Sequence, residues 1–136
     1  MRDIFVKRLT FITVTLIVCF CMFAACRTNK IDYPVYKVTD NKQLNVAELN
    51  YSGIVYRFYG SLPDGESEKA FLGEKIGIRD DSSDFNDICE VKGYDSKEWI
   101  ISYQNNMMGG CSLYKAVDGT DVPFELEKFK DKDLNW

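Results

Sequence analysis

Short alternating apolar segments, separated by turn residues, constrain the fold of this chain more than any other feature of its sequence. In the clearest of them, residues 51–60 (YSGIVYRFYG), Ile54, Tyr56 and Phe58 fall on one face of a strand and Arg57 falls on the other. Comparable strand candidates recur at a spacing of about 10 to 15 residues. They are residues 35–38, 71–80, 87–93, 99–103 and 111–117.

Five to six short strands with turn signals between them predict a mainly β domain, a small antiparallel barrel or sandwich. The sequence Pro63-Asp64-Gly65 predicts a turn, because proline presets the first corner and glycine permits the exit. Gly73 and Gly77 lie inside a predicted strand, where glycine marks a bulge or a close approach of backbones. We therefore expect a curved sheet.

One or two short helices would make the fold α+β. In residues 40–50 (DNKQLNVAELN), Asp40 could cap a helix that turns Leu44 and Ala47 inward, but the same residues equally fit a loop that leads into a strand. The tail that follows Pro123 predicts one or two helical turns.

The first 25 residues have a different character. A basic segment, MRDIFVKR, precedes residues 9–25, a run of 17 residues without a charge. A basic start, an apolar run and an ending in small residues form the pattern of a secretory signal peptide. The alternative is an uncleaved membrane anchor, for which the run is marginal because a spanning helix needs about 20 apolar residues.

The end of this run is more specific. Phe23-Ala24-Ala25-Cys26 resembles the lipobox of bacterial lipoproteins, although that family usually has leucine where Phe23 stands. The resemblance covers the first 26 residues. It implies that the chain is cut before Cys26, that the Cys26 sulfur carries diacylglycerol, and that the new amino group can be acylated. Cys19 and Cys21 would then leave with the signal peptide.

These observations divide the chain into a signal peptide (1–25), a lipidated tether (26–34) and one small β-rich domain (35–136). The resemblance implies a location at the cell membrane, lipid-anchored on the extracytoplasmic face through Cys26. Two acyl chains suffice for stable attachment, whereas one holds only reversibly. The stretch from LGEKIG to ICEVKGYDSKEWI also looks like the hairpin meanders of small secreted proteins of Gram-positive bacteria, a likeness that carries no function.

Composition excludes several classes of function. The chain has no histidine, which removes the commonest general base and the commonest transition-metal ligand. It also has no Gly-rich phosphate loop and no G-x-S-x-G motif. A net charge of −4 with no basic stripe makes a nucleic-acid partner unexpected. We therefore predict no catalytic residue, no metal and no cofactor.

Two cysteines remain in the predicted domain, Cys89 and Cys111. Export permits a disulfide between them. In a simple meander, however, the strand at 99–103 lies between them, and two strand spacings separate the Cα atoms by about 10 Å, against the limit of about 7 Å for a disulfide. A bridge thus requires a different strand closure, and the meander favours two buried free thiols.

Two further groups of residues are candidates for binding. The acidic run Asp80, Asp81, Asp84 and Asp87 could hold Ca²⁺, but its spacing does not match a calcium loop and favours a solvated loop. Aromatic residues could form a patch for carbohydrate or peptide, although alternation on strands favours core positions. They are Tyr51, Tyr56, Phe58, Tyr59, Tyr94, Trp99, Tyr103 and Tyr114. The loop NNMMGG, residues 105–110, is a further candidate for contact with a partner, through its two methionines.

We therefore expect a non-enzymatic, membrane-tethered binding or interaction module with a protein, peptide or glycan ligand. The alternative is an accessory or immunity-type lipoprotein that intercepts a secreted peptide or attends a membrane complex. A minor alternative is a carbohydrate-active enzyme that uses carboxylates alone, since a pair of acidic residues suffices for that chemistry.

Cys26→Ala tests the lipid anchor. We expect this variant to be released from membranes or to remain an unprocessed precursor, because it lacks the sulfur that carries the lipid. Cys21→Ala, in the same apolar run, is the matched control and should behave as wild type in membrane fractionation and intact-mass measurement. Membrane retention of Cys26→Ala at the mature mass would rule out the lipoprotein interpretation.

Overall fold

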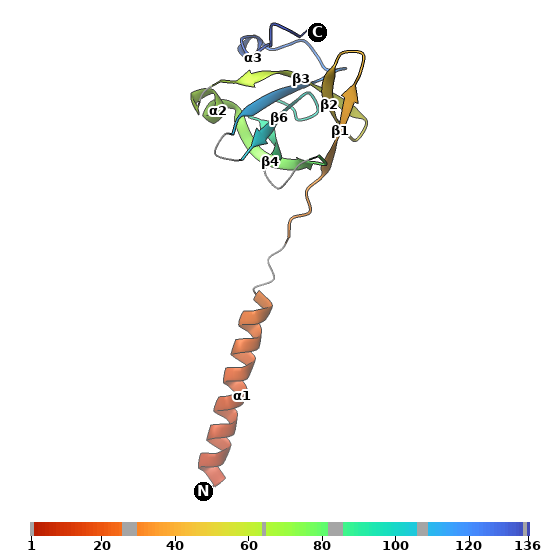
Figure 1. The fold of residues 1–136 in the computed structure, drawn as a ribbon. Helices are drawn as coiled ribbons and strands as arrows, with labels where there is room; N and C mark the ends of the chain where they lie inside the picture. Colours follow the sequence, from red (N-terminus) through yellow and green to blue (C-terminus); the bar gives the residue numbers. More distant parts are fainter. Residues whose placement is uncertain (1, 26–29, 64, 82–85, 106–108, 135) are drawn as a thin grey trace. The chain divides into compact units, whose positions relative to one another are not determined.

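The alternating segments form a closed barrel in the computed structural model, which describes residues 2–25, 30–63, 65–81, 86–105, 109–134 and 136. Within these ranges the barrel has seven strands, in the order β1-β2-β3-β7-β6-β5-β4 around the ring. They are β1 (Val35–Asn41), β2 (Val46–Tyr51), β3 (Ile54–Leu62), β4 (Leu72–Arg79), β5 (Asn86–Val91), β6 (Trp99–Gln104) and β7 (Cys111–Ala116). The predicted mainly β barrel is confirmed (Figure 1).

The ring contains one parallel pair, β1 with β4, and six antiparallel pairs among the described strands. An odd number of strands cannot close with antiparallel neighbours alone, so one parallel contact is a geometric requirement. This contact is short, because it joins only Val35 to Ile78 and Tyr36 to Arg79. The backbone N–H of Ile78 also donates to the Pro34 carbonyl at 2.9 Å, which extends the seam by one residue.

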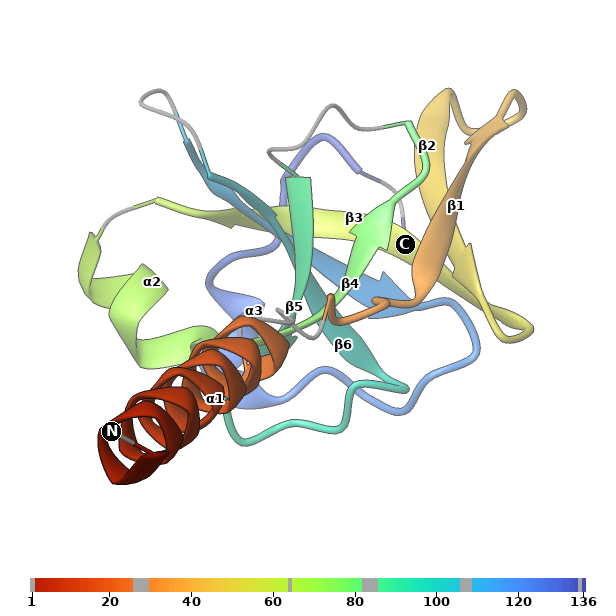
Figure 2. The ribbon, with the colours of Figure 1, turned by 90° about the horizontal axis from the view of Figure 1, so that it is seen from below.

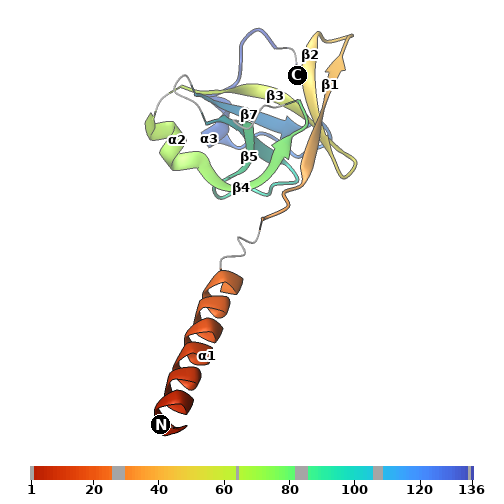
Figure 3. The ribbon, with the colours of Figure 1, turned by 60° about the horizontal axis from the view of Figure 1, so that its bottom comes forward.

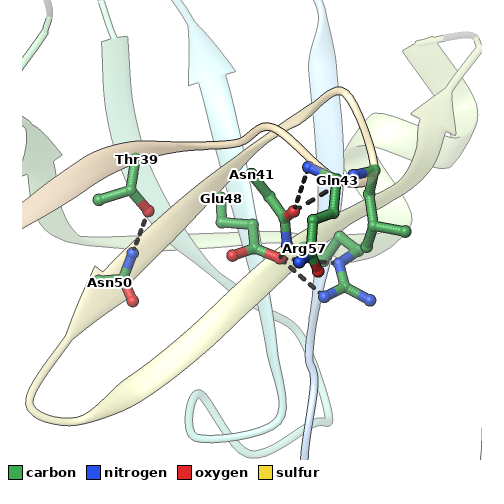
Figure 4. Close-up of polar contacts among 7 residues, drawn as sticks. Thr39, Asn41, Gln43, Glu48, Asn50 and Arg57 are labelled. Atoms are coloured by element: carbon green, nitrogen blue, oxygen red, sulfur yellow. Dashed lines mark hydrogen bonds and ion pairs between the residues drawn. The ribbon is translucent and has the colours of Figure 1, made fainter.

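Residues 40–50 form the β1–β2 hairpin, so the helix considered for them is wrong and the strand alternative holds. The hairpin turns at Asn45, whose φ of 54° asparagine tolerates better than most residues. The side-chain oxygen of Asn41 accepts hydrogen bonds from the backbone N–H groups of Gln43 and Leu44, which closes the turn (Figure 4). This hairpin accounts for the strand beyond the expected five or six.

Three helices occur in the described ranges: α1 (Arg2–Ala25), α2 (Gly65–Phe71) and α3 (Phe124–Glu127). α3 confirms the helical turn predicted after Pro123, whereas α2 was not predicted and begins at Gly65, the last residue of the expected turn. Asp64 of that turn lies outside the described residues. Figure 2 shows α2 on the side of the barrel opposite the β1–β2 hairpin.

The chain divides into two compact units, Met1–Asp32 and Tyr33–Trp136. The first contains α1. In the described part of the chain, none of the helices combines the length and the apolar character needed to cross a membrane. The second unit contains the whole barrel together with α2 and α3.

The interior of the barrel is filled by apolar side chains to which every strand contributes. Among them are Tyr36, Leu49, Tyr56, Ile88 and Ile100, each at most 3% exposed. The aromatic rings pack on one another, with Tyr36 stacked on Tyr51 at 4.6 Å between centroids. Gly77 permits this packing, because a Cβ there would overlap the ring of Tyr36. This confirms the close approach predicted for that glycine, and the register of β4 shifts beside it.

A second apolar layer covers the outer face of β3, β7, β6 and β5. It includes Val91, Trp99, Ile101 and Leu113 from the strands and Leu126 from α3, each at most 1% exposed. Figure 3 shows α2 and α3 beside these strands. Much of these four strands is therefore buried on both faces.

The segment after α3 is fixed against β3 at Gly60. A Cβ at this position would overlap the Phe129 carbonyl, so only glycine allows the two backbones to approach so closely. The N–H of Asp131 then donates to the Tyr59 carbonyl at 2.8 Å. This attachment determines where the residues that follow can lie.

Trp99 lies in the outer layer with Val91 and Leu113, as its place in the meander predicted. It is 1% exposed, and its ring meets that of Tyr59 edge to face at 5.1 Å between centroids. Its core position is confirmed. Tyr103, expected on the same face, is only half-buried at the margin of the layer.

Trp99→Ala should strongly destabilise the barrel domain. Truncating a buried tryptophan costs about 3 to 5 kcal/mol, and a domain has about 5 to 15 kcal/mol of unfolding free energy in total. We expect thermal unfolding of the protein in detergent to show a large loss of melting temperature. Trp136→Ala is the control and should have a small effect, because Trp136 is 39% exposed. A melting temperature for Trp99→Ala within two degrees or so of wild type would contradict the core assignment.

Candidate functional site

A row of side chains crosses the outer face of four neighbouring strands. In the strand register, Glu48 on β2 lies directly opposite Arg57 on β3. Arg57 lies opposite Lys115 on β7, and Lys115 lies opposite Trp99 on β6. Partners that lie directly opposite one another share a face of the sheet. The row therefore places one negative charge, two positive charges and an aromatic ring side by side.

Glu48 and Arg57 form an ion pair. Two nitrogens of Arg57, Nη2 and Nε, donate to Oε1 of Glu48 at 2.7 and 2.9 Å, and both side chains are largely buried. Nδ2 of Asn41 donates to the same oxygen at 3.1 Å (Figure 4). This network joins the β1–β2 hairpin to β3. The negative charge of Glu48 is compensated by Arg57.

Lys115 has no such partner. Its residue is 7% exposed, and its Nζ donates one hydrogen bond, to the Ala116 carbonyl at 3.1 Å. Among the described residues it forms no ion pair. A buried ammonium is costly unless it is paired, so Lys115 is the polar group of the outer face that most lacks a counter-charge.

Trp136 lies over these cations. The guanidinium carbon of Arg57 is 5.4 Å and Nζ of Lys115 is 5.5 Å from the centroid of its ring, distances at which a cation is attracted to an aromatic face. The ring of Tyr59 lies 5.9 Å away at an angle of 56°. The last described residue, Trp136, therefore packs against the charged side chains of Arg57 and Lys115.

A cavity of about 530 Å³ opens beside Lys115, within the range of small-molecule sites. Tyr59, Lys115 and Trp136 line it, together with the exposed charged residues Asp121, Glu127 and Lys130. The wall at residues 119–122 is held by Thr120, whose hydroxyl donates to the carboxylate of Glu98 at 2.9 to 3.0 Å. We name this cavity the Lys115 pocket.

Cys89 and Cys111 are free and buried, with β6 between their strands, as the meander geometry favoured. Burial raises the pKa of Cys89 to about 11, with a smaller contribution from the charge of Asp87. Burial also raises the pKa of Cys111 to about 12, helped by the charge of Glu68. Both cysteines belong to the apolar outer layer and lie outside the Lys115 pocket.

The acidic run does not converge. Asp80 accepts a hydrogen bond from the Val38 N–H, Asp81 pairs with Arg79 and Asp87 pairs with Lys75. Asp84 lies outside the described residues, within which no group of three or more acidic or cysteine side chains could hold a metal ion. The hydrogen bond and charge of Arg79 lower the pKa of Asp81.

The aromatic candidates are mostly core residues. Tyr56, Tyr59, Trp99 and Tyr114 are buried, whereas Tyr51 is 37% exposed. The other three, Phe58, Tyr94 and Tyr103, are half-buried. Of the eight, Tyr59 lines the Lys115 pocket. Cys26 and residues 106–108 of the methionine loop lie outside the described residues.

Sequence reasoning missed Lys115 and Trp136. A signal for Lys115 was present, because Cys111, Leu113 and Lys115 alternate on one strand face and two of the three are apolar. Trp136 carries no local signal, since its contacts depend on the path of the segment after α3.

Comparison with protein-family models, with curated proteins and with solved structures finds no match for this chain. The residues and their geometry are therefore the basis for any functional conclusion.

Alkylation tests the two thiols. In the native protein at pH 8, peptides that carry Cys89 and Cys111 should be modified on the order of a hundredfold more slowly than after denaturation, because the raised pKa values disfavour the reactive thiolate. The rate should rise with pH up to the raised pKa values. Stability should fall above about pH 8.5, where the unfolded chain releases these protons first. An intact mass lower by two hydrogens, restored by reduction, would instead show a disulfide.

Proposed function

We propose that this protein is a membrane-tethered, extracytoplasmic lipoprotein whose barrel domain is a non-enzymatic binding module, with the Lys115 pocket as its ligand site. The tether rests on the resemblance of Phe23-Ala24-Ala25-Cys26 to a lipobox. The binding role rests on one observation: Lys115 is 7% exposed, forms no ion pair among the described residues, and lines an aromatic-walled cavity.

The packing of the barrel supports an external site. Side chains from all seven described strands fill its interior, and those of Leu49, Ile88 and Ile100 are at most 1% exposed. Ligand access is therefore easier at the outer surface, where the segment after α3 and residues 119–122 form walls around Lys115.

A binding role agrees better with the pocket than catalysis by carboxylates does. The acid in glycoside hydrolysis must stay protonated near neutral pH, which requires an apolar environment. The two carboxylates that line the Lys115 pocket, Asp121 and Glu127, are both exposed. They are better suited to accepting hydrogen bonds from a ligand.

The accessory or immunity-type function is the second candidate. The observation in its favour is Phe124 of α3, which is 87% exposed and borders a groove with Phe71 of α2. A large exposed aromatic side chain is typical of protein contacts. Phe124→Ala should weaken capture of a peptide or protein partner if this function holds.

Lys115→Met tests whether Lys115 serves binding or stability. Methionine has a similar length and no charge, and replacing a buried charge by an apolar side chain is often neutral or stabilising. We expect the variant to melt at or above the temperature of wild type without ligand. With a panel of glycans, peptides and small acids, wild type should show a ligand-dependent rise in melting temperature that Lys115→Met lacks.

The control is Lys128→Met, because Lys128 is exposed at the C-cap of α3 and lies outside the Lys115 pocket. It should keep the ligand response of wild type. Destabilisation of unliganded Lys115→Met would assign Lys115 a structural role. A ligand response equal in wild type and Lys115→Met would place the binding site elsewhere.

A further inference from the structure

We infer that the Lys115 pocket recognises an acidic sugar, whose carboxylate binds Lys115 while its hydroxyl groups donate to Asp121 and Glu127. This inference rests on the proposed binding function and names the chemical class of its ligand. The buried floor of the pocket, its charged rim and its aromatic wall each support this assignment.

The floor requires an anion. Arg57 and Lys115 lie directly opposite one another on β3 and β7, an arrangement of like charges that is destabilising. Glu48 pairs with Arg57 at 2.7 Å, so one of the two cations is compensated and the buried one is not. A ligand carboxylate at Nζ of Lys115 would supply the missing charge and accept a charge-assisted hydrogen bond.

Gly119 leaves this ammonium accessible from the cavity. A Cβ built on Gly119 would lie 3.4 Å from Nζ of Lys115, and glycine has no side chain to occupy that space. Nζ uses one of its three hydrogens on the Ala116 carbonyl, so donors remain for a ligand. A planar carboxylate is small enough to enter here.

The rim selects against ligands that are anionic throughout. Asp121 and Glu127 are exposed carboxylates that line the same cavity, and Lys130 is the exposed cation beside them. Carboxylates only accept hydrogen bonds, so the part of the ligand next to them must bear donors. One acidic group at the floor and several hydroxyl groups at the rim describe a uronic acid better than a phosphate or a dicarboxylate.

The wall offers an aromatic surface. The cations of the sheet lie 5.4 and 5.5 Å from the ring of Trp136, which still leaves that residue 39% exposed. An amphipathic ring that is held on one side and exposed on another suits the apolar face of a pyranose. Tyr59, 5.9 Å from Trp136, completes this wall.

The test is a titration of the full-length protein in detergent, labelled with ¹⁵N at tryptophan. The chain has two tryptophans, so the indole signal of Trp136 reports on the pocket, and that of Trp99, buried beneath Lys115 and Tyr59, reports whether the outer layer stays intact. The probes are methyl glucuronide, methyl glucoside, which is the same ring without the charge, acetate, and a short peptide with a free carboxyl terminus.

We expect methyl glucuronide to shift the Trp136 signal and to bind about tenfold more tightly than methyl glucoside, since a hydrogen bond to a charged group contributes at least this much. Lys115→Met should abolish that preference, and Lys128→Met should keep it. Glu127→Gln and Asp121→Asn should weaken the binding of methyl glucuronide without weakening that of acetate.

Other outcomes overturn the assignment in distinguishable ways. Equal affinity for glucoside and glucuronide would show a neutral-sugar site, and tighter binding of the peptide would show recognition of a carboxyl terminus. Either result rejects the acidic-sugar class while the binding function stands. If none of the probes shifts the Trp136 signal, the acidic-sugar class is rejected, and the melting-temperature panel then decides whether the pocket binds another ligand.

Discussion

Burial of β3, β7, β6 and β5 on both faces is the constraint on which the rest of this structure depends. Their inner side chains fill the barrel, and their outer side chains pack under α2, α3 and the segment that follows α3. On β6 this requires apolar residues in succession, and Trp99, Ile100 and Ile101 are each at most 1% exposed. The sequence of a strand buried on both faces is a nearly continuous apolar run and does not alternate. Residues 99–103, WIISY, have this character.

The outer layer also creates the candidate site. β1, β2 and the beginning of β3 lie beyond the cover of the helices, so the row from Glu48 to Trp99 passes from a polar margin into an apolar layer. Lys115 stands at this boundary, where its aliphatic stem is buried and its ammonium faces the cavity. The fold therefore places a charge where solvent cannot fully compensate it, a property that a binding site can use.

The seam that closes the barrel, between β1 and β4, is held by fewer contacts than the strands at its centre. The seam between β1 and β4 contains two residue pairs and is supported from outside the ladder, because Asp80 binds the N–H of Val38 through its side chain and the Tyr36 carbonyl through its own N–H. Opening of this seam would expose the interior tyrosines without disturbing the outer layer. The two apolar layers thus need not have the same local stability.

The sequence by itself determined the mainly β class, most strand positions, the helical turn after Pro123 and the core position of Trp99, because alternation and turn residues act over short distances. It left the hairpin at 40–50 open, since Leu44, Ala47 and Leu49 fit a helix and a strand equally well until the barrel requires Leu49 inside. Only the tertiary structure decided the closing parallel pair and the Lys115 pocket. Both join residues that are distant along the chain, such as Tyr59, Lys115 and Trp136, and no local pattern encodes contacts that depend on the whole ring and the path of the tail across it.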